Sequence, residues 1–407
     1  MKKILHIISQ YPGRTGSGIY LNALAKEGKR RGYTQGLIAG IPYSDNFQPK
    51  YVEEFYPMVF NTEELPFSIV GMSDTMPYES TRYNELTDEM LYQWESSFRK
   101  AIIYALEDFE PDIILSHHLW LSTSLVRELA PNAKVIGICH GTDIRQLEKC
   151  PQYKDHILSN FKKLDLVLSL SDFQREDIER IYNIPKSKIV TIGGGYDEDI
   201  FFHPLDKISN EKIKIVYAGK LSFAKGLVSL LNIFKEIREK NNLELYLAGS
   251  GTGKEEKFIK TLAMEIGSNI SFFGELTQKE LGQVFRESHI FVLPSFFEGL
   301  SLVSIEALAS GMLIVATEIE GLKSNLGSEI NENGVIEYVK LPRMTKVDEP
   351  LKEDLEIFEN RFKLGIEKQI EKVKEGYKVD EDIKKRIKEK SWKNIFNKII
   401  DYIECIN

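Results

Sequence analysis

The sequence has little of several features that would assign it to a particular class of protein. Only three of its 407 residues are cysteine, and none is spaced like a zinc ligand pair, so we expect neither a disulfide framework nor a zinc cage. No apolar run approaches the roughly 18 residues that a membrane-spanning helix needs. The start, MKKILHIISQ, is interrupted by Ser9 and Gln10 before a signal segment is complete, so it predicts a first strand. A cytoplasmic protein with reduced thiols is the expectation.

An excess of positive charge is also absent. The chain has 53 Lys and Arg against 61 Asp and Glu, a net charge of −8, which argues against a nucleic-acid partner. One short basic segment, KEGKRRG at 26–32, would permit peripheral contact with the inner face of a membrane. The hydrophobic fraction of 42% is that of an ordinary globular protein, and 407 residues favour two domains.

Short apolar runs alternate with helical stretches along most of the chain. The runs rich in Ile and Val predict strands buried on both faces of parallel sheets. They lie at 4–8, 35–40, 112–116, 134–139, 165–170 and 188–192, and again at 213–218, 243–248, 269–273, 290–293 and 313–316. Two such series predict two doubly wound domains, with the boundary between them in the polar stretch 201–212. Residues 41–80 are less regular and favour a hairpin or a loop over a cleft, and helices dominate after about residue 345.

Parallel sheets bind ligands at the carboxyl ends of their strands, so the loops there are the candidate sites. Gly16 and Gly18 follow the first strand and precede a helix. His140 follows another strand in HGTD, where a structural hydrogen-bonding role and a catalytic one are both open. Lys220 and Lys225 lie on one loop before a helix, where they are either solvated or form a site for a diphosphate.

Two glutamates surround the start of a short predicted helix in FEGLSLVSIEALASG, residues 297–311. Ser301 is a good N-cap and Gly311 a good terminator, so Glu298 lies on the loop and Glu306 inside the helix. Carboxylates accept strong hydrogen bonds from vicinal hydroxyls, and the amides between them suit phosphates. A nucleotide sugar has its parts in this order.

At these residues the sequence resembles the retaining glycosyltransferases of GT-B fold, family four. Glu298 and Glu306, with seven residues between them, match that family's donor-site signature. The resemblance extends to the first glycine loop, HGTD at 140–143, GGGYD at 193–197, Lys220, Lys225-Gly226 and FFGEL at 272–276. It implies two Rossmann-like domains facing a central cleft. Residues 1–205 would form the acceptor-side domain, 206–389 the donor domain, and a helix at about 390–407 would cross back to the first.

The resemblance also implies a role for each matching residue. His140, Lys220, Lys225 and Glu298 would be catalytic. The donor-binding positions would be Gly16, Gly18, Gly274, Leu276, Gly299, Leu300, Ser301 and Glu306. No metal or cofactor is implied, since the lysines replace a divalent ion. The donor would be a nucleoside-diphosphate sugar, and uridine is the nucleoside expected from the family. Lysine at position 220, where the family often has arginine, offers a point charge instead of a fork.

The acceptor is less defined by the sequence. SHHLWL at 116–121 places His117, His118 and Trp120 after a strand, and we assign these three and Asp143 to the acceptor side, although Trp120 suits a core position equally well. A glycan, a glycolipid or a small-molecule hydroxyl would fit. Alternatives on the same fold are a sugar-nucleotide epimerase, a sugar phosphorylase and a non-catalytic nucleotide-sugar binding protein. A glycosidase would have no use for the two lysines.

Overall fold

The computed structural model describes all residues except 1, 14, 75, 205–211, 347 and 407. The described chain forms two compact units. The first contains residues up to Gly193 together with Ile395 onward, and the second contains Gly194–Asn394. The predicted boundary between residues 205 and 206 lies outside the described residues. The units divide earlier because the segment after Gly193 already packs on the second unit, where Phe201 lies against Phe285.

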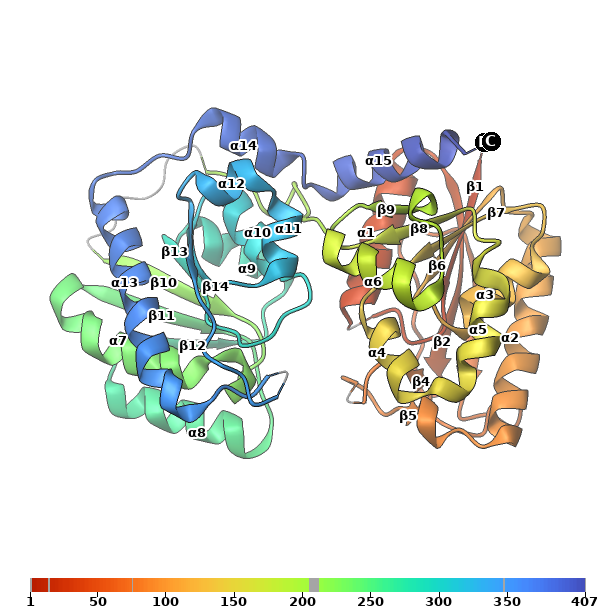
Figure 1. Ribbon diagram of the computed structural model, residues 1–407, viewed down its shortest axis with the longest axis horizontal. Coiled ribbons are helices and arrows are strands. Elements are labelled where there is room, and N and C mark those ends of the chain that lie inside the picture. The colour runs from red at the N-terminus through yellow and green to blue at the C-terminus, as the bar shows by residue number, and fades with distance from the viewer. Residues whose placement is uncertain (1, 14, 75, 205–211, 347, 407) are drawn as a thin grey trace. The chain divides into compact units, whose positions relative to one another are not determined.

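The first unit is built on a seven-stranded, wholly parallel sheet with the order β3-β2-β1-β6-β7-β8-β9 (Figure 1). Its strands are β1 (Lys3–Ile8), β2 (Thr34–Pro42), β3 (Glu54–Phe60), β6 (Ile113–His117), β7 (Lys134–Ile138), β8 (Leu166–Ser169) and β9 (Ile189–Thr191). The connecting helices are α1 (Gly16–Arg30), α2 (Asp88–Phe109), α3 (Leu121–Leu129), α4 (Thr142–Lys149), α5 (Lys154–Phe161) and α6 (Asp172–Tyr182). A two-stranded pair, β4 (Val70–Gly71) and β5 (Thr81–Arg82), lies apart from this sheet.

The second unit has a six-stranded parallel sheet with the order β12-β11-β10-β13-β14-β15. The strands are β10 (Ile213–Ala218), β11 (Leu243–Ala248), β12 (Ile270–Gly274), β13 (Ile290–Leu293), β14 (Leu313–Thr317) and β15 (Ile336–Val339). The helices are α7 (Leu227–Asn241), α8 (Gly253–Ile266), α9 (Gln278–Arg286), α10 (Leu302–Ala309), α11 (Glu320–Leu326), α12 (Ser328–Glu332), α13 (Leu355–Lys374) and α14 (Glu381–Lys388). Two doubly wound parallel sheets confirm the predicted fold class.

Both sheets reverse their strand order at one point. The chain adds β2 and β3 on one side of β1 and then returns to place β6 on the other side. In the second unit it adds β11 and β12 beside β10 and then returns with β13. The loops that follow the two central neighbours therefore leave in opposite directions, and this opening is where such sheets bind ligands.

The segment 41–80 contains neither a hairpin nor only a loop, so that prediction was wrong. Residues Glu54–Phe60 form β3, which pairs in parallel with β2 over seven residues at the edge of the sheet. Pro57 cannot donate a ladder hydrogen bond, and an edge strand tolerates it because only one side is paired. The proline and the mixed polarity of EFYPMVF hid this strand in the sequence.

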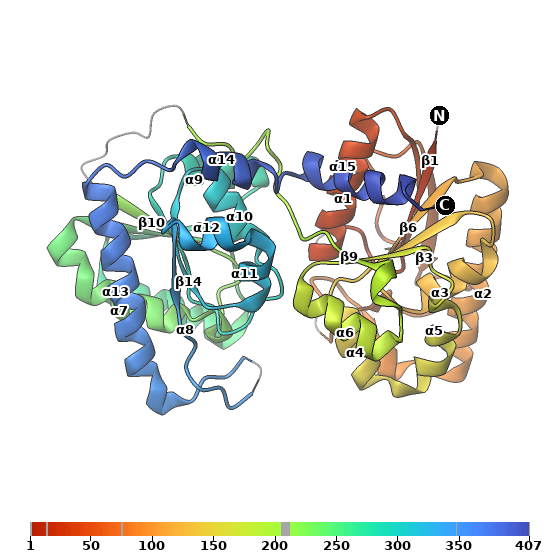
Figure 2. The same ribbon diagram turned by 45° about the horizontal axis from the view of Figure 1, so that its top comes forward.

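The last helix, α15 (Trp392–Glu404), joins the first unit from Ile395 onward, although it follows the whole second unit in sequence. Figure 2 shows this blue helix beside the red α1. Phe396 is fully buried and meets the Tyr33 ring edge-on at 5.8 Å. Lys134 donates to the carbonyl oxygens of Ile403 and Ile406, at the carboxyl end of the helix, where a cation is favourable.

Replacing Phe396 with alanine should destabilise the first unit by about 3–5 kcal/mol, because the change removes a buried aromatic side chain and leaves a cavity. Urea unfolding followed by hydrogen exchange, which assigns the loss to the strands of the first unit, measures this. Tyr402→Ala, at a 38% exposed position in the same helix, is the matched control. Equal effects of the two variants would contradict the docking role of Phe396.

Candidate active site

The loops after β10 and β13 form the centre of the candidate site in the second unit. The amide of Phe296 donates to the carbonyl oxygen of Ala224 at 3.0 Å and ties the two loops together. Gly226 is the N-cap of α7, with φ +67°, and a Cβ there would lie 2.1 Å from the carbonyl oxygen of Pro294. Only glycine allows this close approach, because it combines a left-handed backbone with no side chain. The Lys-Gly pair predicted at 225–226 therefore has a local structural reason.

Lys225 and Glu298 meet across these loops. The Lys225 Nζ lies 2.7 Å from the Glu298 Oε1 and also donates to the carbonyl oxygen of Phe297 at 3.3 Å. The hydroxyl of Ser295 donates to the same carboxylate oxygen at 2.8 Å. Both charged side chains stay partly exposed, at 25% and 20%, so the pair can still exchange partners with a ligand. The pair holds one cation and one acceptor at the opening of the sheet.

Lys220 lies on the loop after β10 and is exposed. Its carbonyl oxygen accepts a 2.8 Å hydrogen bond from the hydroxyl of Tyr217, the penultimate residue of β10. Tyr217 is buried beneath the loop, and its burial together with the nearby Glu298 raises the pKa of its hydroxyl, which therefore stays a donor. Tyr217 fixes the backbone that carries the lysine. Nothing in the sequence distinguished this tyrosine from other apolar strand residues.

Helix α10 begins as predicted, directly after Ser301, but the predicted cap differs in its chemistry. Ser301 takes a left-handed conformation, φ 51° and ψ 66°, and its hydroxyl pairs with that of Ser304 at 2.8 Å instead of capping an amide. A left-handed non-glycine residue costs about 1–3 kcal/mol and is usual at ligand sites. The preceding turn is close-packed, because a Cβ on Gly321 would lie 2.0 Å from the carbonyl oxygen of Gly299.

Glu306 is inside α10 and only 6% exposed. Within the residues that the structure describes, no hydrogen bond or ion pair involves its carboxylate. Burial, with a smaller contribution from the negative charge of Asp197, raises the pKa of Glu306 to about 8. Burying a carboxyl group costs free energy unless the group gains hydrogen-bond donors. Asp197, in the GGGYD segment, is a neighbour that sequence reasoning did not identify as part of this site.

The remaining predicted donor positions divide between the two units. Gly274 ends β12 with φ +67°, and its carbonyl oxygen accepts the amide of Gly249 at 2.7 Å. Leu276 packs on the core of the second unit, and Leu300 lies close to Gly194. Strand β12 is two places from β10 in the sheet, so Gly274 ends and Leu276 follows a different strand from the one that precedes Lys225. Gly16 and Gly18 belong to the first unit, at the start of α1, where Gly18 donates its amide to the Thr15 hydroxyl at 3.1 Å.

His140 follows β7 in the first unit and packs with three other aromatic rings. Its Nε2 lies 3.1 Å from the Nδ1 of His117, and the two rings are stacked at 5.3 Å. The His118 ring lies 4.7 Å away and that of Tyr20 meets it edge-on at 5.4 Å. Burial lowers the pKa of His140 to about 3. The ring is therefore neutral at ordinary pH.

The side chains assigned to the acceptor side are all buried: His117, His118, Trp120 and Asp143. Trp120 packs against Tyr83 and Tyr153 in the core, so the core interpretation of this residue is the correct one. Asp143 accepts the amides of Leu119 at 2.8 Å and of His140, and so ties two strand-end loops together. The structure exposes none of these side chains for direct contact with an acceptor.

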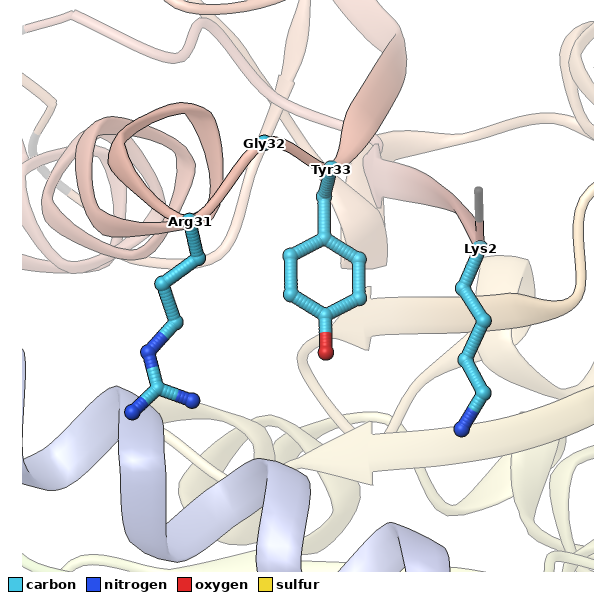
Figure 3. A pocket seen from close by; sticks show the side chains of 4 residues that line it. All are labelled: Lys2, Arg31, Gly32 and Tyr33. Carbon is cyan, nitrogen blue, oxygen red and sulfur yellow. The ribbon is translucent and has the colours of Figure 1, made fainter.

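A pocket of about 420 Å³ lies elsewhere in the first unit and is lined by Lys2, Arg31, Gly32 and Tyr33 (Figure 3). Lys2 precedes β1 and Tyr33 precedes β2, so the pocket lies at the amino ends of the strands. Ligands of parallel sheets bind at the opposite edge. Lys2 is also paired with Glu404 at 2.8 Å. This pocket is therefore separate from the candidate site.

Two family models match consecutive parts of the chain. A profile of Glycosyl transferases group 1 matches residues 200–344, and one of Glycosyltransferase Family 4 matches residues 14–200. An uncharacterized glycosyltransferase of Methanocaldococcus jannaschii is 26% identical over 189 residues, which cover 43% of this chain and 47% of that protein. The chain thus spans about half the length of that curated relative.

Two solved structures share the fold over nearly the whole chain. Sucrose-phosphate synthase from Thermosynechococcus elongatus superposes with a TM-score of 0.69 at 17% identity, covering 99% of this chain and 98% of that one. The Anabaena protein HepE, solved in complex with UDP and glucose, superposes with a TM-score of 0.66 at 13% identity, covering 99% and 100%. At these identities the likeness shows the GT-B fold alone.

The raised pKa of Glu306 predicts how stability depends on pH. Between pH 4.5 and about 8 the unfolded chain loses this proton and the folded chain keeps it, so ionisation favours unfolding increasingly as pH rises. Glu306→Gln, which stays neutral, should therefore gain thermal stability over the wild type at pH 8 but not at pH 4. Melting curves at the two pH values check this, with Glu332→Gln at an exposed helix end as control. A constant difference at both pH values would contradict the raised pKa.

Proposed function

We propose that this chain, which belongs to the group 1 glycosyltransferases of GT-B fold, transfers a sugar from a nucleoside-diphosphate sugar to an acceptor hydroxyl with retention of anomeric configuration and without a metal ion. The observation that carries the proposal is the buried Glu306 carboxyl, which has no partner within the described residues and lies in the helix that follows the loop carrying Glu298. The vicinal hydroxyls of a ribose are donors that would make its burial favourable.

The donor diphosphate would lie between the lysines and the start of α10. Lys225 would exchange part of its contact with Glu298 for a phosphate oxygen, and the exposed Lys220 would supply a second cation. Helix amides after Ser301 suit the same anion. These groups act most strongly on charge that grows as the bond breaks, so they stabilise the transition state more than the bound substrate. A divalent ion would add charge where two lysines already supply it.

In the proposed reaction the bond between the anomeric carbon and the diphosphate oxygen breaks, and a bond from the acceptor oxygen to that carbon forms on the same face of the sugar. The acceptor proton passes to the departing phosphate oxygen, so the protein needs no strong base. Glu298 would hold hydroxyls of the transferred sugar, and His140 would bind a sugar hydroxyl, as the family resemblance implies. UDP is the nucleotide we propose, because HepE, of the same fold, was solved with UDP and glucose.

The proposed reaction needs only a hydroxyl group on its acceptor. A glycan, a glycolipid or a small-molecule hydroxyl would all suit the reaction. Among the described helices, none is long and apolar enough to cross a membrane. Peripheral contact through the basic segment 26–32 stays a prediction.

UDP should stabilise the wild type without magnesium. At 100 times its dissociation constant a ligand adds about 2.7 kcal/mol to the free energy of unfolding. Thermal unfolding with UDP, GDP, ADP and dTDP, each with and without magnesium, measures the effect and identifies the base. Glu306→Ala should lose the stabilisation, whereas Glu332→Ala, at the exposed end of α12, should keep it.

A nucleotide that stabilises Glu306→Ala as much as the wild type would contradict the ribose role. No shift with any of the four nucleotides would contradict the donor site itself. Release of nucleoside diphosphate from the corresponding sugar nucleotide, in the presence of an acceptor library, then separates a transferase from a protein that only binds the donor.

A further inference from the structure

Four of the seven histidines of the chain lie in one buried cluster in the first unit: His6, His117, His118 and His140. His6 is on β1, His117 ends β6, and His118 and His140 follow β6 and β7. The His6 and His117 ring centroids are 6.2 Å apart, and the planes of the His117 and His140 rings are almost parallel, with an angle of 11° between them. The cluster therefore spans the opening where the strand order of the first sheet reverses.

The neutral rings of His117 and His140 share one hydrogen bond. A neutral imidazole has one N–H donor and one bare nitrogen acceptor, so the 3.1 Å contact from His117 Nδ1 to His140 Nε2 needs a proton on one of these atoms only. Each choice determines the tautomer of both rings. Which choice is correct can be decided from the other nitrogen of His117, its Nε2.

The His117 Nε2 is buried and has no partner within the described residues. If His140 were the donor, His117 would carry its proton on that Nε2, and a buried N–H would stay without an acceptor. If His117 is the donor, the Nε2 is only a bare acceptor. Buried N–H groups without a partner are rare, whereas acceptors without a full set of donors are less unusual. The second arrangement is thus favoured.

In the neighbouring His6 the unpartnered nitrogen is also a bare acceptor, and there the hydrogen-bond network determines the tautomer. The Gln35 Nε2 donates to the carbonyl oxygens of Ala25 and Tyr51, at 2.7 and 2.9 Å, so the Gln35 Oε1 faces His6. His6 must therefore donate from Nε2, and its buried Nδ1, which has no partner in the described chain, is a bare acceptor. The unpartnered nitrogen of His6 is an acceptor, as we argue for His117.

We infer that His117 is a positioning residue, which donates from Nδ1 to the Nε2 of His140 and holds His140 in the tautomer with its proton on Nδ1. His118 supports the ring from another side. Its left-handed backbone, φ 72°, is held by its amide bonded to the Ile138 carbonyl and its carbonyl bonded to the Thr123 hydroxyl. His140 thereby presents a fixed, neutral N–H donor toward a ligand oxygen.

This inference deepens the proposed function, and only its kinetic consequence rests on that function. If His140 contacts the transferred sugar, it does so as a neutral donor to a hydroxyl or ring oxygen and not as a general base. A donor whose tautomer is fixed in advance needs no reorganisation when the sugar binds. Activity should then be insensitive to pH near the ordinary titration range of histidine.

The tautomer can be measured directly. In protein labelled with ¹⁵N-histidine, long-range ¹H–¹⁵N correlation spectra distinguish a protonated Nδ1 from a protonated Nε2. The His140 signals are assigned by their loss in His140→Asn, and the exposed His156 is the matched control through His156→Asn. We expect a single His140 tautomer with the proton on Nδ1. A proton on Nε2 in the wild type would overturn the inference.

Two variants at position 117 test the hydrogen bond. His117→Phe keeps a ring but removes the donor, so His140 should become a mixture of tautomers and kcat/KM should fall roughly 10-fold to 100-fold, as for loss of the partner that orients a functional histidine. His117→Asn, whose amide can replace the Nδ1–H, should retain the wild-type His140 spectrum and most of the activity. An unchanged His140 spectrum in His117→Phe would contradict the inference.

The two hypotheses fail separately. If His117→Phe does not fold, the wild-type and His117→Asn spectra still decide the tautomer. If the wild type binds no nucleotide and transfers no sugar, the proposed function is wrong, while the position of the His140 proton is still tested by the same spectra.

Discussion

The direction of the strands is the constraint on which the other features depend. Because every pairing in the two large sheets is parallel, each strand delivers its last residue to the same edge of its sheet. The reversal of strand order then separates the loops after β10 and β13, and likewise those after β1 and β6. Lys225 and Glu298 are 73 residues apart in sequence and meet only because of this topology. His117 and His140 meet at the equivalent edge of the first sheet for the same reason.

The two units use polar groups in opposite ways at these edges. The first unit buries neutral imidazoles, which pair with one another and with Gln35, so burial costs little as long as the rings stay unprotonated. The second keeps the charged Lys225–Glu298 pair partly exposed and buries the Glu306 carboxyl group, which has no partner among the residues that the structure describes. A neutral edge suits recognition of hydroxyls, and an edge with cations suits phosphates.

Much of this architecture could be predicted from the sequence, and the exceptions have physical reasons. The strands at 213–218, 243–248 and 290–293 were predicted to the residue, because continuous Ile, Leu and Val runs are typical of strands covered on both faces. The edge strand β3 was hidden by Pro57, and Ser301 was assigned the correct position with the wrong cap geometry. The loops carrying Lys225 and Glu298 were also found, but the contact between these residues depends on sheet order, which local patterns do not encode. The burial of His117 and Trp120 was equally inaccessible, since a histidine or tryptophan after a strand is compatible with core and surface alike.

The path of the chain makes the second unit an insertion into the first. The chain leaves the first unit after Gly193 and returns at Ile395, so one unit is continuous in sequence and the other is not. During synthesis the seven-stranded sheet is translated well before α15, and until that helix emerges Tyr33 lacks Phe396 and Lys134 lacks the carbonyl groups it binds. The second unit is built from one continuous range and needs no segment from elsewhere in the sequence. The first unit therefore reaches its native structure only after α15 has been made, and a truncation at the carboxyl end damages the domain at the amino end.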